Sequence, residues 1–160
     1  MQFKILQENL KQSLSHLQNA IPSKPQLPIL SSVYLDIKDN ILTLAATDLY
    51  LGVRTKNRVQ TDKNIELVLP GDTFKKIIYS FDAGEIRVEK KEKGVLLKSK
   101  QSKAKIPAQS AEEYPDFPEI DGQQFSIPAE FLLKIKELVS FAASTDQARP
   151  VLTAVHFKFS

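Results

Sequence analysis

A short strand pattern followed at once by an amphipathic helix pattern occurs three times in this sequence, and no other feature constrains the fold as much. In the first copy Phe3 and Ile5 alternate with polar residues, as in a half-buried strand, before a helical stripe begins. In the second and third copies a proline closes the strand, at Pro70 and at Pro128. The spacing of these prolines predicts an internal repeat of about sixty residues.

Each helix pattern places apolar side chains three or four positions apart, so that one face is apolar and the other polar. The stripes are Leu10, Leu14 and Leu17, then Phe74, Ile77, Ile78 and Phe81, then Phe131, Leu132, Ile135, Leu138, Val139 and Ala142. Asp72 is well placed to stabilise the N-terminus of the second helix. We expect the first two stripes to pack beside each other on one face of the sheets, with their polar sides on a shared outer surface.

Three further strands should follow each of the first two helices. They are predicted at residues 33–37, 41–45 and 51–59, and again at 85–90, 95–100 and 102–106. Loops this short join antiparallel strands, since a parallel connection needs a dozen or more residues. The predicted fold is therefore α+β, made of repeated β-α-β-β-β units, with antiparallel sheets on one side and two helices per domain on the other.

The two units together should form one domain, residues 1–120. Residues 111–122 are acidic, contain two prolines and lack periodicity, which is typical of a linker. Residues 121–160 then begin a second domain, with a strand at 125–127, a helix and a strand at 151–159. One unit cannot close a domain, so we expect this chain to be an N-terminal fragment with an incomplete second domain.

Composition excludes several classes of function. The chain has no cysteine, so it forms no disulfide and no thiolate metal site. His16 and His156 lack metal-ligand spacing, and the carboxylates of Glu112, Glu113 and Asp116 lie on the predicted linker. We therefore expect no metal, no cofactor and no enzyme; a reproducible turnover by the pure protein would favour that rival class.

The expected location is the cytoplasm, because a chain without cysteine fits a reducing compartment. No signal peptide starts the chain and no apolar run approaches the ~18 residues of a membrane span, so we expect no membrane partner.

The net charge of +3 is too small to indicate nucleic-acid binding by itself. Residues 87–105 hold eight basic residues against two acidic ones. A solvated outer hairpin explains this excess, because lysine commonly protects strand edges, and a binding patch is the alternative.

Four segments carry a family resemblance: K-P-Q-L-P-I-L (24–30), A-A-T-D-L (45–49), E-Y-P-D-F-P (113–118) and F-A-A-S-T-D-Q-A-R-P-V-L-T (141–153). They resemble, in the expected order, the bacterial DNA sliding clamp, the beta subunit of DNA polymerase III. The resemblance implies the DNA clamp fold, in which six two-unit domains form a homodimeric ring around duplex DNA with the helices inside. It also implies a processivity factor for DNA replication, which tethers the replicative polymerase and slides without sequence specificity.

The resemblance also implies which residues face DNA. Lys24 lies in the proline-rich loop where the family presents a basic DNA contact, and Lys11, Lys75, Lys76 and Lys134 lie on the helices. Acidic residues on the same helices nearly balance these lysines. The lining is then only mildly positive, which suits a ring that must slide.

Two further sites follow from the resemblance. Arg149 and Leu152 match part of a groove that receives linear peptides from the DNA polymerase III catalytic subunit, the clamp loader, and repair and other polymerases. Lys103, Ala104 and Ile106 match the edge strand that closes the homodimer. The alternative function is a peptide-binding scaffold or adaptor that does not encircle DNA.

Overall fold

The computed structural model describes residues 1–61, 63–117, 126–146 and 148–158. It divides the chain into two compact units, Met1–Phe117 and Pro118–Ser160. The predicted domain limits, 1–120 and 121–160, stay a prediction, because residues 118–125 lie outside the described residues.

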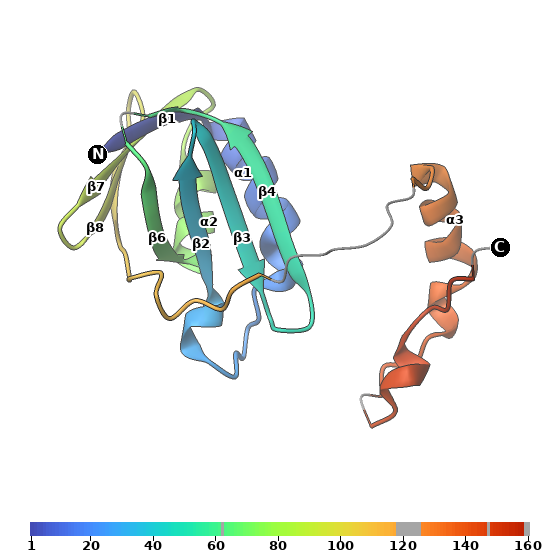
Figure 1. The fold of residues 1–160 in the computed structure, drawn as a ribbon. Coiled ribbons are helices and arrows are strands. Elements are labelled where there is room, and N and C mark those ends of the chain that lie inside the picture. Colours follow the sequence, from blue (N-terminus) through green and yellow to red (C-terminus); the bar gives the residue numbers. More distant parts are fainter. Residues whose placement is uncertain (62, 118–125, 147, 159–160) are drawn as a thin grey trace. The chain divides into compact units, whose positions relative to one another are not determined.

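The first unit contains both predicted repeats (Figure 1). Its elements are β1 (Gln2–Leu6), α1 (Gln7–Leu17), β2 (Ser32–Lys38), β3 (Ile41–Thr47), β4 (Gly52–Arg58), β5 (Gln60–Thr61), β6 (Ile65–Pro70), α2 (Gly71–Ser80), β7 (Glu85–Lys91), β8 (Gly94–Lys98) and β9 (Lys103–Pro107), with short 3-10 helices at Gln18–Ala20 and Pro28–Ser31. The order of strand, helix and three strands is confirmed in each repeat, with ends that differ from the prediction by a few residues. The two-residue strand β5 was not predicted.

The strands form two antiparallel sheets, in the orders β5-β1-β7-β8-β9 and β4-β3-β2-β6. The first strand of each repeat lies in the sheet of the other repeat. Phe3 of β1 is opposite Val88 of β7, and Leu67 of β6 is opposite Leu35 of β2. The repeats have therefore exchanged their first strands, and neither repeat can complete a sheet alone.

The hairpin turns follow local residue chemistry. Asp39 and Asn40, between β2 and β3, have φ values of 51° and 61°, a left-handed pair that suits two-residue hairpins. Gly94 opens β8 with a φ of 153°. A Cβ there would lie 2.1 Å from the carbonyl oxygen of Ile106, so β8 and β9 approach too closely for any side chain.

Both helices lie behind the sheet β4-β3-β2-β6 in Figure 1. Their apolar stripes share one core with both sheets, as predicted: Leu10 and Leu14 of α1 and Phe74 and Ile78 of α2 are all fully buried. Burying each such side chain stabilises the fold by roughly 1.5–3 kcal/mol. Gln7 of α1 also links the two helices by a hydrogen bond, in which its Nε2 donates to the carbonyl oxygen of Ile78 at 2.8 Å.

The second unit contains helix α3 (Ala129–Leu138), as predicted, and short 3-10 helices at Ser140–Ala142 and Pro150–Thr153. Its apolar stripe is exposed; Phe131, for example, is 51% exposed. The predicted strand at 151–159 is wrong over its described part, which starts as a 3-10 turn at Pro150 and then has no regular structure. A strand needs a neighbour to bond with, and residues 126–158, as far as described, supply none. Of the predicted strand at 125–127, Phe125 lies outside the described residues and the other two residues are not extended strand.

Candidate nucleic-acid interface

The outer sides of α1 and α2 meet at an aromatic ring. The Nζ of Lys11 in α1 lies 5.1 Å from the centre of the Tyr79 ring in α2, and the Nζ of Lys75 lies 5.7 Å from it. Both distances fall within the ~6 Å range of a cation–π interaction. Lys75 also donates to the Oε1 of Gln18 at 2.8 Å, across the helix pair. Two ammonium groups from different helices are thereby held together on one surface.

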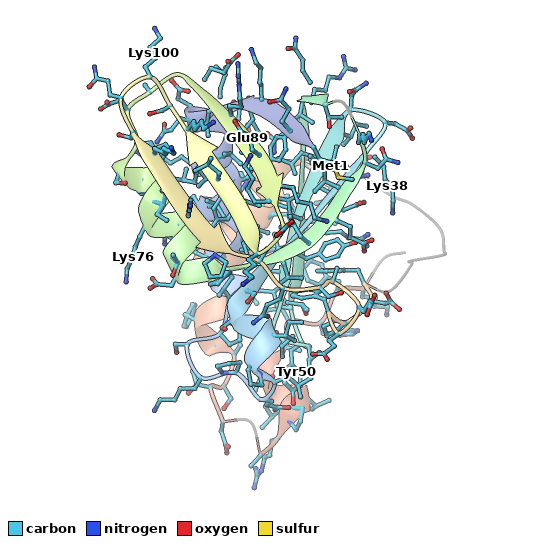
Figure 2. The ribbon with its side chains drawn as sticks, turned by 90° about the vertical axis from the view of Figure 1, so that its left-hand side faces the viewer. Met1, Lys38, Tyr50, Lys76, Glu89 and Lys100 are labelled. Carbon is cyan, nitrogen blue, oxygen red and sulfur yellow. The ribbon has the colours of Figure 1, made fainter. Side chains whose placement is uncertain are left out.

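Lys76 differs from these two lysines. Its Nζ lies 2.6 Å from the Oδ2 of Asp72, one helical turn earlier, in an exposed ion pair. Figure 2 shows Lys76 on the outer side of α2, pointing away from the sheets. Its charge is locally balanced by that carboxylate, although an exposed pair of this kind contributes only about 0.2–1 kcal/mol to stability.

Lys24 is exposed in the loop that leads to β2. The loop between β3 and β4 lies at the same end of the sheet (Figure 1), because β2 begins where β3 ends. There the backbone N–H groups of Leu51 and Tyr50 donate to the Oδ1 of Asp48, and these bonds lower the pKa of that carboxyl. Tyr50 is 89% exposed at the tip of the loop (Figure 2), a feature that the sequence reasoning did not single out.

The strand edge predicted for the dimer contact is β9, the last strand of its sheet. Lys103 is exposed and Ala104 is half-buried. Ile106 is fully buried, so its side chain packs in the core and only its backbone lies at the edge. Strand β4 is the equivalent edge of the other sheet, since β4 and β9 are each the third strand after the helix of their repeat.

Residues 109–117, which we call the strap, cross the outer face of the sheet β4-β3-β2-β6. Gln109 exchanges backbone hydrogen bonds with Val68 of β6, at 3.0 and 3.1 Å. Tyr114 is only 6% exposed, and its hydroxyl donates to the carbonyl oxygen of Ser32 at 3.3 Å. This burial raises the pKa of Tyr114 to about 12. The predicted linker is thus a packed segment up to the last described residue before the gap.

Phe117 ends the strap over β4. The guanidinium of Arg54 lies 4.9 Å from the centre of its ring. A Cβ on Gly52 would lie 2.9 Å from the Cε1 of Phe117, so the ring sits directly on the glycine backbone. Sequence reasoning missed this contact because an aperiodic acidic segment gives no sign of burial.

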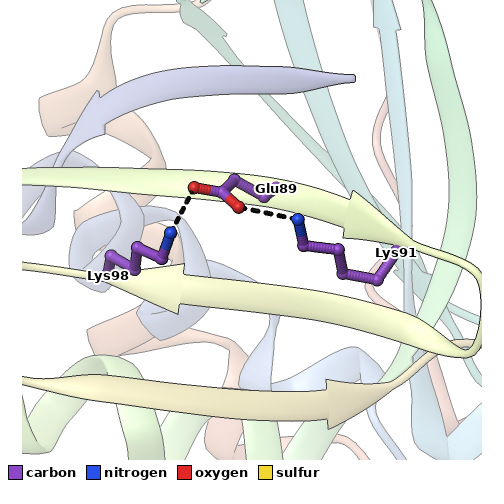
Figure 3. A network of polar contacts seen from close by, with 3 residues as sticks. All are labelled: Glu89, Lys91 and Lys98. Atoms are coloured by element: carbon purple, nitrogen blue, oxygen red, sulfur yellow. Dashed lines mark hydrogen bonds and ion pairs between the residues drawn. The ribbon is translucent and has the colours of Figure 1, made fainter.

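The outer face of the other sheet is basic but partly neutralised (Figure 3). The carboxylate of Glu89 lies 2.6 Å from the Nζ of Lys98 on the neighbouring strand and 3.0 Å from the Nζ of Lys91. Hydrogen bonds from Lys98 and then Lys91 lower the pKa of Glu89 to about 2. This cross-strand arrangement supports the interpretation of residues 87–105 as a solvated outer hairpin.

In the second unit, Arg149 and Leu152 share a single turn. The backbone N–H of Leu152 donates to the carbonyl oxygen of Arg149 at 2.9 Å, and the N–H of Ser144 donates to the oxygen of Leu152 at 2.8 Å. Both side chains are exposed on that turn, as is Lys134 on α3.

Within the described ranges, no three His, Asp or Glu residues come together as a metal site. In that same part of the chain, no helix is both long enough and apolar enough to cross a membrane.

The exchanged repeats, the two antiparallel sheets and the paired helices define an α+β DNA clamp domain. The model of the family described as DNA polymerase III beta subunit, N-terminal domain, matches residues 1–118, and the chain belongs to this family. Sliding clamps of this family are not catalytic, as the sequence predicted.

Relatives match nearly the whole chain in sequence and in fold. The beta sliding clamp of Haemophilus influenzae is 29% identical over 161 residues, covering 99% of this chain and 44% of that protein. The DNA polymerase III subunit beta of Pseudomonas aeruginosa has a similar crystal structure, with a TM-score of 0.87 at 25% identity, covering 95% of this chain and 42% of that one. The Helicobacter pylori beta clamp, crystallised with a DNA ligase peptide, has a TM-score of 0.81 at 26% identity, covering 91% and 41%. The chain thus spans less than half the length of these relatives.

Proposed function

We propose that this chain is the N-terminal part of a processivity factor that encircles duplex DNA and tethers the replicative polymerase to it. One observation carries the proposal: the domain has both helices on one side and ends each repeat with an edge strand, β4 and β9. Each edge can pair with a neighbouring domain, and head-to-tail pairing that closes on itself gives a ring. The paired helices would then line the inside of that ring.

In a ring, the time that the protein stays on DNA does not depend on its affinity for DNA. Non-specific binding to duplex DNA has a Kd of about 10⁻⁴ to 10⁻⁶ M at physiological salt, which is too weak to hold a polymerase in place. Stronger phosphate contacts would slow sliding. An enclosed duplex cannot leave sideways, so a weakly positive lining is sufficient, and the partly neutralised helix surface fits that demand.

We assign the duplex contacts to Lys11, Lys75, Lys24 and Lys134, with Lys76 available when its pair with Asp72 opens. All are exposed or half-buried on helices or on the loop before β2. Their number is small and acidic side chains lie near them, so binding should be weak and independent of base sequence.

The β9 edge is proposed as the homodimer contact, with Lys103 and Ala104 supplying side chains and Ile106 only backbone. The turn with Arg149 and Leu152 is proposed to bind linear peptides, as an exposed guanidinium beside an exposed leucine suits an extended peptide with polar and aliphatic anchors. The proposed partners are the DNA polymerase III catalytic subunit, the clamp loader, and repair and other polymerases. These partners place the protein in the bacterial cytoplasm.

The test is retention on circular against linear DNA. A protein carrying this chain together with the further length that its relatives have is loaded onto nicked plasmid by its clamp loader and separated by gel filtration. We expect it to stay with the circle and to leave after one restriction cut, because a threaded ring slips off open ends. Equal retention on both forms would contradict the proposal, and peptide binding without any retention on DNA would support the adaptor instead.

A further inference from the structure

The three lysines on the paired helices are not equivalent in their surroundings. Lys76 is paired with the carboxylate of Asp72 at 2.6 Å. Lys11 and Lys75, in the part of the chain that the structure describes, form no ion pair, and each lies against the ring of Tyr79. One helix surface thus holds one ammonium group that is paired with a carboxylate and two that lie against an uncharged ring.

Tyr79 is 41% exposed and lies off the buried stripe of α2, so the core does not explain why an aromatic residue is present. Its ring meets lysines from both helices, and Lys75 is fixed further by Gln18. A ring attracts a cation without supplying a negative charge, so the ammonium groups remain able to donate to an incoming phosphate. A carboxylate partner would have to be displaced first.

We propose that Tyr79 is a positioning residue for DNA contact, which holds Lys11 and Lys75 so that these two, rather than Lys76, meet the backbone phosphates of the duplex. This inference rests on the proposed function, since it assumes that the helix surface faces DNA.

The ranking predicts different salt dependences. Each phosphate contact contributes a slope of about −0.9 to log K against log salt concentration. Lys11→Ala and Lys75→Ala should each reduce that slope by about one contact, whereas Lys76→Ala should change it by less than half as much. Lys76 is the matched control, because it lies on the same helix and carries the same formal charge.

Tyr79 is tested by Tyr79→Leu with Tyr79→Phe as the rescue. A cation–π interaction at an exposed site is weak, so Tyr79→Leu should lower affinity about 2- to 5-fold, while Tyr79→Phe, which keeps the ring, should bind like the wild type. Affinity of the 160-residue chain for a fluorescent 12-base-pair duplex is measured by anisotropy at several salt concentrations. Amide and side-chain NMR spectra of the same samples show which lysines respond to DNA, and circular dichroism confirms that each variant is folded.

The inference is overturned if Tyr79→Leu binds like the wild type, if Tyr79→Phe binds as weakly as Tyr79→Leu, or if Lys76→Ala reduces the salt slope as much as Lys75→Ala. If the wild type is retained on circular DNA and any of these occurs, the inference fails and the proposed function stands. If DNA shifts no resonance of the helix surface and the loaded protein is not retained on circles, both fail.

Discussion

Among the glycines that the structure describes, Gly94 leaves the least room for a side chain. An alanine Cβ there would lie 2.1 Å from the carbonyl oxygen of Ile106, and 3.0 Å from both the carbonyl carbon of Ile106 and the Cα of Pro107. All three are backbone atoms of β9, so no side chain can rotate away. The residue also has a φ of 153°, a conformation that side chains rarely adopt. Gly94→Ala must therefore separate β8 from β9.

Two costs add at this position. The backbone conformation alone costs about 1–3 kcal/mol for a residue with a Cβ. Moving β9 away by about 1 Å weakens at least one cross-strand hydrogen bond, and a buried group left without its partner costs about 1–3 kcal/mol more. The expected loss in the free energy of unfolding is about 2–6 kcal/mol, which lowers the Tm by roughly 10–30 °C for a domain of this size.

Gly84→Ala is the matched control. Gly84 has a φ of 131°, but a Cβ there meets no atom within 4 Å, so this variant carries the conformational cost without the clash. Urea unfolding followed by far-UV circular dichroism gives the free energy of unfolding of both variants and of the wild type. The reasoning is refuted if Gly94→Ala is no less stable than Gly84→Ala.

Three further outcomes follow from contacts on the outer faces. The lowered pKa of Glu89, about 2 against an ordinary value of 4.5, means that its ion pairs stabilise the fold fully above pH 4.5 and lose their effect as the pH falls toward 2. The stability difference between wild type and Glu89→Gln should therefore shrink over that range in urea unfolding. A pH-independent difference would contradict this. Gly52→Ala should lower the free energy of unfolding of the wild type by about 1–2 kcal/mol, because the new Cβ clashes with the ring of Phe117. In a Phe117→Ala background the same substitution should have little effect. Additive losses in this double-mutant cycle would exclude the contact. Tyr114→Phe should lower the free energy of unfolding by about 1 kcal/mol, because the hydrogen bond from the Tyr114 hydroxyl to the backbone is lost. An unchanged midpoint of unfolding would show that this bond is not formed.

The sequence predicted the repeats because their information is local. Leu10 and Leu14, or Phe74 and Ile78, report a buried helix face by spacing alone, and Asp39 with Asn40 reports a tight hairpin. The exchange of first strands was not predicted. Periodicity identifies which strands have a buried face but does not say which neighbour each strand pairs with, and that choice depends on the whole domain.

The candidate site was predicted less completely. A period of two would have indicated that Ile106 turns inward with Ala104 while Lys103 faces outward, since alternate residues of a strand share a face. No such signal exists for Tyr79, whose role depends on a lysine 68 positions earlier in the chain. Tyr114 is similar, because its burial depends on an adjacent sheet surface and not on its own segment.

The exchanged first strands also limit the order in which the strands can pair during synthesis. Strand β1 is the first to leave the ribosome, yet its partner β7 is made on the order of 80 residues later, a delay of several seconds at about 5–20 residues per second. Until β7 is made, β1 can pair only with the two-residue strand β5, and until β6 is made, β2, β3 and β4 lack their fourth strand. A nascent chain stopped within this domain therefore exposes apolar surface that the complete fold buries in a core shared by both repeats.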